Sequence, residues 1–143
     1  MKVIFVLVAF LVAALPAEAR NTEHYYSVKD ALRDGQGAGK VGSDVRLYFA
    51  GEKHPAVKKS QGVWETRKST RGFMRSDETA CHVAFLSAVL QLQARARTEG
   101  GDGVVDIVSI TRGMETSSPT EYRCVAGATV VHVGLKGRVV KLK

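Results

Sequence analysis

The fold of this chain rests on residues 76–101, whose sequence is SDETACHVAFLSAVLQLQARARTEGG. Ser76 is a typical helix N-cap, and the two acids after it suit the positive end of a helix dipole. Gly100 and Gly101 tolerate the left-handed backbone angles that end a helix. Apolar residues, mostly alanine, recur at every fourth position and so lie on one face of a helix: Ala80, Ala84, Ala88, Leu92 and Ala96. We predict a helix over residues 77–99 whose alanine face packs closely on a sheet.

Two segments rich in β-branched residues follow this helix, at 104–111 and 124–133. Both are typical of strands. A polar connector with Ser117, Ser118 and Pro119 separates them, which predicts an antiparallel hairpin. One face of the second strand carries small side chains that can receive the alanines of the helix. That face consists of Cys124, Ala126, Ala128, Val130 and His132.

Other segments carry weaker signals. Residues 44–50 alternate polar and apolar side chains, which predicts a half-buried strand with Val45, Leu47 and Phe49 toward the core. We also expect a strand near 63–68, a short helix within 25–32, and a short edge strand in the basic tail 136–143. The predicted fold class is α+β, with one long helix packed on a small, mainly antiparallel sheet.

The first 19 residues have the features of a secretory signal peptide. Lys2 precedes an apolar run over residues 3–15, which is shorter than the roughly 20 residues of a membrane-spanning helix. The small residues just before Arg20 suit cleavage by a signal peptidase at that point. We therefore expect a periplasmic or secreted protein without an integral membrane segment. Its mature part is one α+β domain over 20–143, of which 20–43 is flexible.

The chain has two cysteines, Cys81 and Cys124. Export to an oxidising compartment makes a disulfide between them the expected state. In the chain-entropy model a loop of this length stabilises the fold by about 4 kcal/mol. The alternative is a pair of reduced thiols, which are ligands for a soft metal ion.

Positive charge gathers between residues 52 and 75, in a chain of net charge +7. Only Glu52 and Glu65 oppose it there, and Trp64 and Phe73 lie among the basic residues. Such a mixture is typical of surfaces that bind a polyanion, for example lipopolysaccharide phosphate or nucleic acid. A solvated surface without a ligand is the alternative. The candidate polyanion-binding residues are Lys53, Lys58, Lys59, Arg67, Lys68, Arg71 and Arg75.

The sequence contains no complete catalytic pattern, so we expect a protein that is not an enzyme and has no cofactor. Residues 35–40 approach a phosphate loop, but Asp34 replaces its first glycine and Val41 its hydroxyl residue. ATP is therefore not an expected partner. Asp106 lies in an otherwise apolar strand, so a hydrolase with a buried carboxylate is one hypothesis. A carboxylate that faces water at a sheet edge or sheet end is the alternative.

Four histidines are possible metal ligands: His24, His54, His82 and His132. No two have the i, i+3 or i, i+4 spacing that places ligands on one helix face, and a disulfide removes the thiolates. The sequence therefore predicts surface or hydrogen-bonded histidines and no metal site. His82 and His132 are the weak candidates, because His82 follows Cys81 and His132 lies on the predicted face of Cys124.

Four segments carry a resemblance to known proteins, and their sequences are KSTRGF at 68–73, DETAC at 77–81, GDGVVDIVS at 101–109 and EYRCVAG at 121–127. They resemble small exported proteins of Gram-negative bacteria that are often named excinuclease ATPase subunits. Excinuclease or ATPase activity is not expected here, because this sequence lacks the phosphate loops and zinc-binding cysteines of a repair ATPase.

The second half of the chain also carries a more distant similarity, in its alanine-rich helix and the glycine-led valine strand after it. This pattern is similar to the putative heavy-metal-binding family and to the Rcs-system envelope stress-sensor lipoprotein. The similarity implies a compact α+β domain with a helix on a small sheet, but it transfers no metal ligands.

These observations lead to a functional hypothesis. Export, the disulfide, the positive charge and the missing catalytic pattern favour a non-enzymatic binding module of the cell envelope. Its expected partner is an envelope protein or an anionic envelope component. The alternative is a metal-binding envelope protein that uses histidines, together with thiols if the cysteines are reduced.

Overall fold

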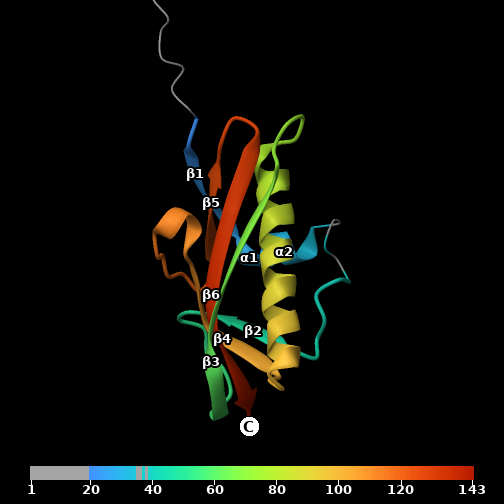
Figure 1. The fold of residues 1–143 in the computed structure, drawn as a ribbon, viewed down its shortest axis with the longest axis vertical. Helices are drawn as coiled ribbons and strands as arrows, with labels where there is room; N and C mark the ends of the chain where they lie inside the picture. The colour runs from blue at the N-terminus through green and yellow to red at the C-terminus, as the bar shows by residue number, and fades with distance from the viewer. Residues whose placement is uncertain (1–19, 35–36, 38) are drawn as a thin grey trace, which may run out of the picture.

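The computed structural model describes residues 20–34, 37 and 39–143 (Figure 1). The predicted signal peptide and part of the glycine-rich segment at 35–40 lie outside the described residues. In chain order the elements are β1 (Thr22–Ser27), α1 (Val28–Arg33), β2 (Arg46–Phe49), β3 (Val57–Arg71), α2 (Asp77–Thr98), β4 (Gly103–Ser109), the short 3₁₀ helix η1 (Thr111–Gly113), β5 (Glu121–Ala126) and β6 (Val130–Leu142).

The described strands form one curled, six-stranded sheet around the long strand β6 (Figure 1). β3 pairs with β6 from Val57 opposite Leu142 to Arg71 opposite Val130. On its other side β6 pairs first with β5 and then with β4. β1 lies beyond β5, and β2 lies beyond β4 in a parallel pair. The mixture of helix and a largely antiparallel sheet is as predicted, but the sheet is larger and more curved than the small one expected.

α2 confirms the predicted helix. The Ser76 hydroxyl oxygen accepts a hydrogen bond from the backbone N–H of Thr79 at 3.1 Å. Glu99 is the C-cap, and Gly100 follows with φ +77°. The alanines of the predicted face are fully buried, because α2 packs on β6 and β3 (Figure 1). Neither α2 nor another helix of the described residues has the length and apolar character needed to cross a bilayer.

The core lies between α2 and the inner face of the sheet, which is the face toward this helix. Phe85 of α2 stacks on Tyr122 of β5, with ring centroids 4.2 Å apart. Gln93 of α2 is also fully buried, and its amide donates hydrogen bonds to the carbonyls of Gly42 and Val45 at 2.9 and 2.8 Å. Those bonds tie the segment before β2 to the helix. The inner face of β6 contributes Val131, Val133, Leu135 and Val139.

The hairpin predicted between 104–111 and 124–133 is wrong. The second segment contains two strands, β5 and β6, joined by a turn in which the Gly127 N–H donates to the Val130 carbonyl at 2.8 Å. β4 pairs with the second half of β6 instead of with β5. The small-residue face predicted over 124–132 therefore does not exist, because the turn interrupts the alternation of side chains.

The basic tail is not the edge strand predicted over 136–143. It is the end of β6, and β3 and β4 flank it on both sides. Val139 is buried on the inner face, whereas Val140 is buried on the outer face in a small cluster with Val105 and Leu142. Alternating valines and cations fit an edge strand and a half-covered central strand equally well, so the sequence pattern could not separate them.

The N-terminal part of the described chain also differs from the prediction. Residues 25–27, expected in a helix, belong to β1, which pairs with β5 from Thr22 opposite Ala126 to Ser27 opposite Glu121. The helix α1 starts only after Ser27, whose hydroxyl oxygen accepts a hydrogen bond from the Asp30 N–H at 3.1 Å. β1 and α1 thus occupy residues 22–33 of the segment 20–43, for which a flexible lead was expected.

The two remaining strand predictions are correct in position. Val45, just before β2, and Phe49, at its end, are buried, and Leu47 between them is half-buried. β3 extends well beyond the predicted 63–68, because the charged side chains of its outer face hide the alternation from a hydropathy pattern.

Candidate functional site

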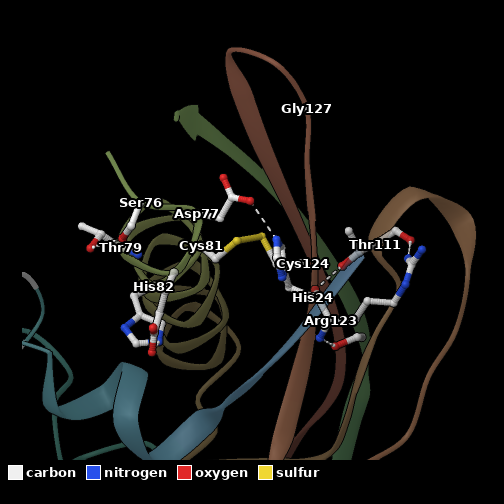
Figure 2. Close-up of a disulfide and its surroundings, with 12 residues drawn as sticks. His24, Ser76, Asp77, Thr79, Cys81, His82, Thr111, Arg123, Cys124 and Gly127 are labelled. Atoms are coloured by element: carbon white, nitrogen blue, oxygen red, sulfur yellow. Dashed lines mark hydrogen bonds and ion pairs between the residues drawn. A yellow bond between two sulfur atoms is a disulfide. The ribbon is translucent and has the colours of Figure 1, made fainter. Parts of the chain in front are cut away.

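Cys81 and Cys124 form the predicted disulfide (Figure 2), with their Cα atoms 6.0 Å apart. Cys81 comes from the beginning of α2 and Cys124 from β5, and both are fully buried. The bond joins residues separated by 43 positions and fixes the helix to the inner face of the sheet. It also removes both thiols as metal ligands.

His24 lies close to the disulfide (Figure 2), with its Nε2 2.8 Å from Oδ2 of Asp77. Arg20 contacts the same carboxylate oxygen. Burial raises the pKa of Asp77, but hydrogen bonds from Arg20 and His24 outweigh it and hold the pKa below its ordinary value. This group of side chains ties β1 to the beginning of α2.

His82 occupies a buried polar position below the disulfide (Figure 2). Its Nδ1 is 2.9 Å from Oδ2 of Asp34, and its Nε2 is 3.9 Å from Glu78. Tyr122, near this group, is 1% exposed, and its hydroxyl has no hydrogen-bond partner among the described residues. Burial raises the pKa of Tyr122 far above its ordinary value. Acid–base catalysis needs access to a substrate, so burial of His82 and Tyr122 favours a structural role.

The two weak metal candidates lie on opposite faces of the sheet. Val125 pairs with His132, so His132 lies on the outer face, whereas Cys124 and His82 are on the inner side. His132 and His82 therefore cannot share a metal ion. Nδ1 of His54 interacts with the Pro55 carbonyl at 2.8 Å. In the described part of the chain, no group of three or more His, Cys, Asp or Glu side chains is placed to hold a metal ion.

Asp106 is an exposed carboxylate on β4. It has φ +53°, lies at an irregularity in the pairing of β4 with β6, and forms an ion pair with Arg138 at 2.8 Å. Its side chain is 56% exposed. A hydrolase with a buried carboxylate at this position is therefore excluded, and the water-facing alternative is correct.

The structure disperses most of the predicted polyanion-binding residues. Arg67 and Arg71 lie on the outer face of β3, because they pair with Gly134 and Val130 of β6. Lys68 pairs with Val133 and is on the inner side. The others lie near the ends of β3 or in the loops beside it, and they are Lys53, Lys58, Lys59 and Arg75.

One hollow on the outer face brings Arg67 and Arg112 together, and we call it the anion pocket. Arg67 also forms an ion pair with Glu65 at 3.0 Å. The volume of the pocket is about 120 Å³. The Ser69 hydroxyl and Nδ1 of His132 lie 2.8 Å apart at its side, on neighbouring strands. Arg67 comes from β3 and Arg112 from η1. The lining residues are Arg67, Lys68, Ser69, Thr111, Arg112, His132, Val133 and Gly134.

A buried arginine holds η1 against this pocket. Arg123 is 6% exposed; its Nη1 donates to the Thr111 carbonyl and its Nε donates to Glu23 at 2.5 Å (Figure 2 shows Arg123 beside Thr111). The Thr111 hydroxyl donates to the Arg123 carbonyl at 2.7 Å and accepts from the Gly134 N–H at 3.0 Å. A Cβ on Gly134 would lie 3.1 Å from Ile110, so glycine allows the loop to approach β6 closely.

Sequence reasoning missed most of this pocket. It proposed Arg67 and Lys68 for their charge, but Ser69 and His132 are 63 positions apart and meet only through strand pairing. Arg112 has φ +56°, an unusual angle for a residue with a side chain, and no sequence pattern marks it. Arg123 was the one visible signal, since a cation inside an apolar strand needs a buried partner.

Comparisons with known proteins leave the family open. No family model matches the chain, and no curated protein matches it. One similar solved structure is a protein of unknown function of the DUF74 family from Pediococcus pentosaceus ATCC 25745, at 17% identity and a TM-score of 0.49, covering 69% of this chain and 98% of that one. A similarity this weak carries no argument, so the resemblances drawn from sequence remain predictions.

Proposed function

We propose that this protein is a non-enzymatic module of the cell envelope that binds a phosphate- or sulfate-bearing polyanion at the anion pocket. The observation that carries the proposal is the convergence of Arg67 and Arg112 beside the Ser69–His132 pair. Two of these groups come from β3, one from β6 and one from η1, so the pocket is a product of the folded chain.

The donors of the pocket match a tetrahedral anion. A guanidinium presents a planar fork of N–H donors that fits two oxygens of a phosphate or sulfate group. Nη1 of Arg67 donates to Glu65 at 3.0 Å, so an anion in the pocket would compete with this exposed carboxylate for Arg67. The Ser69 hydroxyl and the His132 ring, 2.8 Å apart, add polar groups beside the two guanidinium groups. A volume of about 120 Å³ has room for one such group and not for a sugar or a base beside it. The protein therefore recognises the ligand by its phosphate or sulfate groups.

The wider charge distribution supports the same partner. A net charge of +7 attracts polyanions over a distance, and Arg71 continues the positive outer edge of β3 beyond the pocket. Because the protein is predicted to be exported, it would meet phosphorylated envelope components in the periplasm. Both features favour a polymer or glycolipid over a small free anion.

The Ser69–His132 pair does not support a hydrolase. In a serine hydrolase a carboxylate orients the imidazole whose other nitrogen takes the proton of the serine. Among the described residues, no carboxylate lies within hydrogen-bond distance of His132; its interaction is with Ser69. The pair is also on an open sheet face, where water is not excluded.

The test is binding of inorganic polyphosphate, with polyglutamate as a polyanion that lacks phosphate. Because both pocket guanidinium groups contact the anion, we expect the double variant Arg67→Ala/Arg112→Ala to bind polyphosphate at least tenfold more weakly. The dependence of log Kd on log salt should also become shallower by about 2, one for each lost contact. Fluorescence anisotropy over a salt series measures both quantities.

The matched control is Lys53→Ala/Arg75→Ala, which removes the same charge outside the pocket. It should retain most of the affinity for polyphosphate. Equal losses in the two double variants would show that net charge alone drives binding, and equal affinity for polyglutamate would show that phosphate is not recognised; either result contradicts the proposal.

A further inference from the structure

A second hollow, which we call the α1–β2 groove, lies where α1, β2 and the segment before β5 meet. Its volume is about 440 Å³, and it shares no lining residue with the anion pocket. Its walls are mainly apolar, from Val28, Leu32, Leu47, Phe49 and Pro119. The remaining lining residues are Ser27, Lys29, Glu52 and Thr120.

The size and lining of this groove are those of a small-molecule site. Such sites usually span about 300 to 1,000 Å³ and combine apolar walls with a few placed polar groups. A neighbouring hollow of about 410 Å³ continues along β2 and shares Leu32 and Leu47 with the α1–β2 groove. The apolar surface is therefore long enough for a linear chain that starts at one hollow and ends in the other.

Glu52 is the unusual group of the groove. Ten carboxylates among the described residues have a basic or histidine nitrogen within 4 Å. The carboxylates without one are Asp30, Glu52 and Glu121, and of these three only Glu52 is partly buried. Burial raises the pKa of Glu52, while the Phe49 N–H lowers it through a hydrogen bond. A chain of net charge +7 thus keeps an uncompensated carboxylate at an apolar groove.

The edge of β2 does not favour an extended peptide as the occupant. Strand addition needs a row of free backbone groups. β2 is four residues long, and the Phe49 carbonyl already accepts the Glu52 N–H at 2.9 Å. Few backbone groups are left for a partner strand, so recognition must come from the apolar walls and the carboxylate.

We infer that the α1–β2 groove binds a cationic amphiphile, namely a primary alkylammonium whose head pairs with Glu52 and whose chain lies on Leu32 and Leu47. A half-buried carboxylate favours an ammonium partner more strongly than an exposed one does, because screening by water is weaker there. Lys29, the groove's other charged residue, is exposed on α1 and can keep its own ammonium in water.

The experiment measures binding of n-octylammonium, octanoate and n-butylammonium to the purified protein by NMR chemical-shift titration. We expect octylammonium to bind at least tenfold more tightly than octanoate, which has the same chain and the opposite charge. Butylammonium should bind more weakly than octylammonium, because its chain covers less of the apolar wall. Shifts should map to α1, β2 and residues 119–120.

Two variants locate the head group. Glu52→Gln should remove the preference for octylammonium over octanoate, whereas Glu121→Gln, which removes an exposed uncompensated carboxylate, should leave it unchanged. Thermal unfolding of each variant checks that the fold is retained, and Leu47→Ser should weaken both octyl ligands without changing the preference.

Three results would overturn the inference: no saturable binding of octylammonium, a preference for octanoate, or an unchanged preference in Glu52→Gln. Polyphosphate binding at the anion pocket is a separate measurement with a different probe. Failure of one proposal therefore leaves the other testable.

Discussion

The two faces of strand β6 are built on different physical principles. The inner face is packed against α2 by valines and leucine that are at most 1% exposed, and the disulfide fixes the same side. The outer face carries charged side chains in ion pairs, such as Lys136 with Glu115, and is partly covered by the loop that contains η1. The inner face supplies stability through burial, which is not directional. The outer face has a small apolar cluster at Val105, Val140 and Leu142, but its part near η1 is held by hydrogen bonds. Because hydrogen bonds are directional, that part is the one that can be selective for a ligand.

The largest effect is expected from opening the covalent link of the inner face. Replacing both Cys81 and Cys124 by alanine should lower the free energy of unfolding by about 4 kcal/mol, because the unfolded chain regains the entropy of the closed loop. Urea denaturation of the wild type and the double variant measures the difference. A loss below about 1 kcal/mol would mean that apolar packing alone holds α2 on the sheet.

A smaller effect is expected from the buried cation of the outer face. Arg123→Met keeps the apolar stem but removes the bonds to Thr111 and Glu23, so the free energy of unfolding should fall by about 2 kcal/mol. Release of η1 should also weaken polyphosphate binding about tenfold, since Arg112 loses its position.

The control for Arg123 is Arg33→Met, which removes an exposed guanidinium from α1. It should change stability by no more than about 0.5 kcal/mol and leave polyphosphate binding intact. If Arg123→Met loses stability but still binds polyphosphate like the wild type, the loop position is not what creates the anion pocket.

The smallest effect concerns an exposed ion pair at the rim of the inner face. Hydrogen bonds from Arg97, at 2.7 and 2.9 Å, lower the pKa of Asp44 from 3.8 to about 2. The folded state therefore prefers the ionised carboxylate. Its stabilising contribution is complete above pH 3.8 and is lost as the pH falls through about 2.

NMR titration of the Asp44 carboxyl carbon tests this pair directly. Arg97→Gln should return the pKa of Asp44 toward 3.8, with little change in unfolding at neutral pH because the pair is solvent-screened. A pKa that stays near 2 in Arg97→Gln would assign the shift to the backbone N–H groups of the loop instead.

Prediction from sequence succeeded for the long helix and several strands, and it failed for β1 and for the assembly of the sheet. The helix over 77–98 was found because its cap, its period and its terminal glycines are all local signals. The hairpin prediction was wrong because an alternating pattern indicates which residues form a strand but not which other strand pairs with it. Gly127 was the signal in the sequence that the strand ends there, but the β-branched residues on both sides of it favoured one continuous strand.

The amino-acid sequence alone determined the long helix and the strands near residues 44–50, 63–68 and 104–111, since each depends on neighbouring residues. Its two cysteines also allow only one disulfide within the chain. The three-dimensional structure decided the order of the strands, the burial of Arg123, the meeting of Ser69 with His132 and the isolation of Glu52. These depend on contacts between residues far apart in the chain, and local periodicity contains no information about which distant segments will pair.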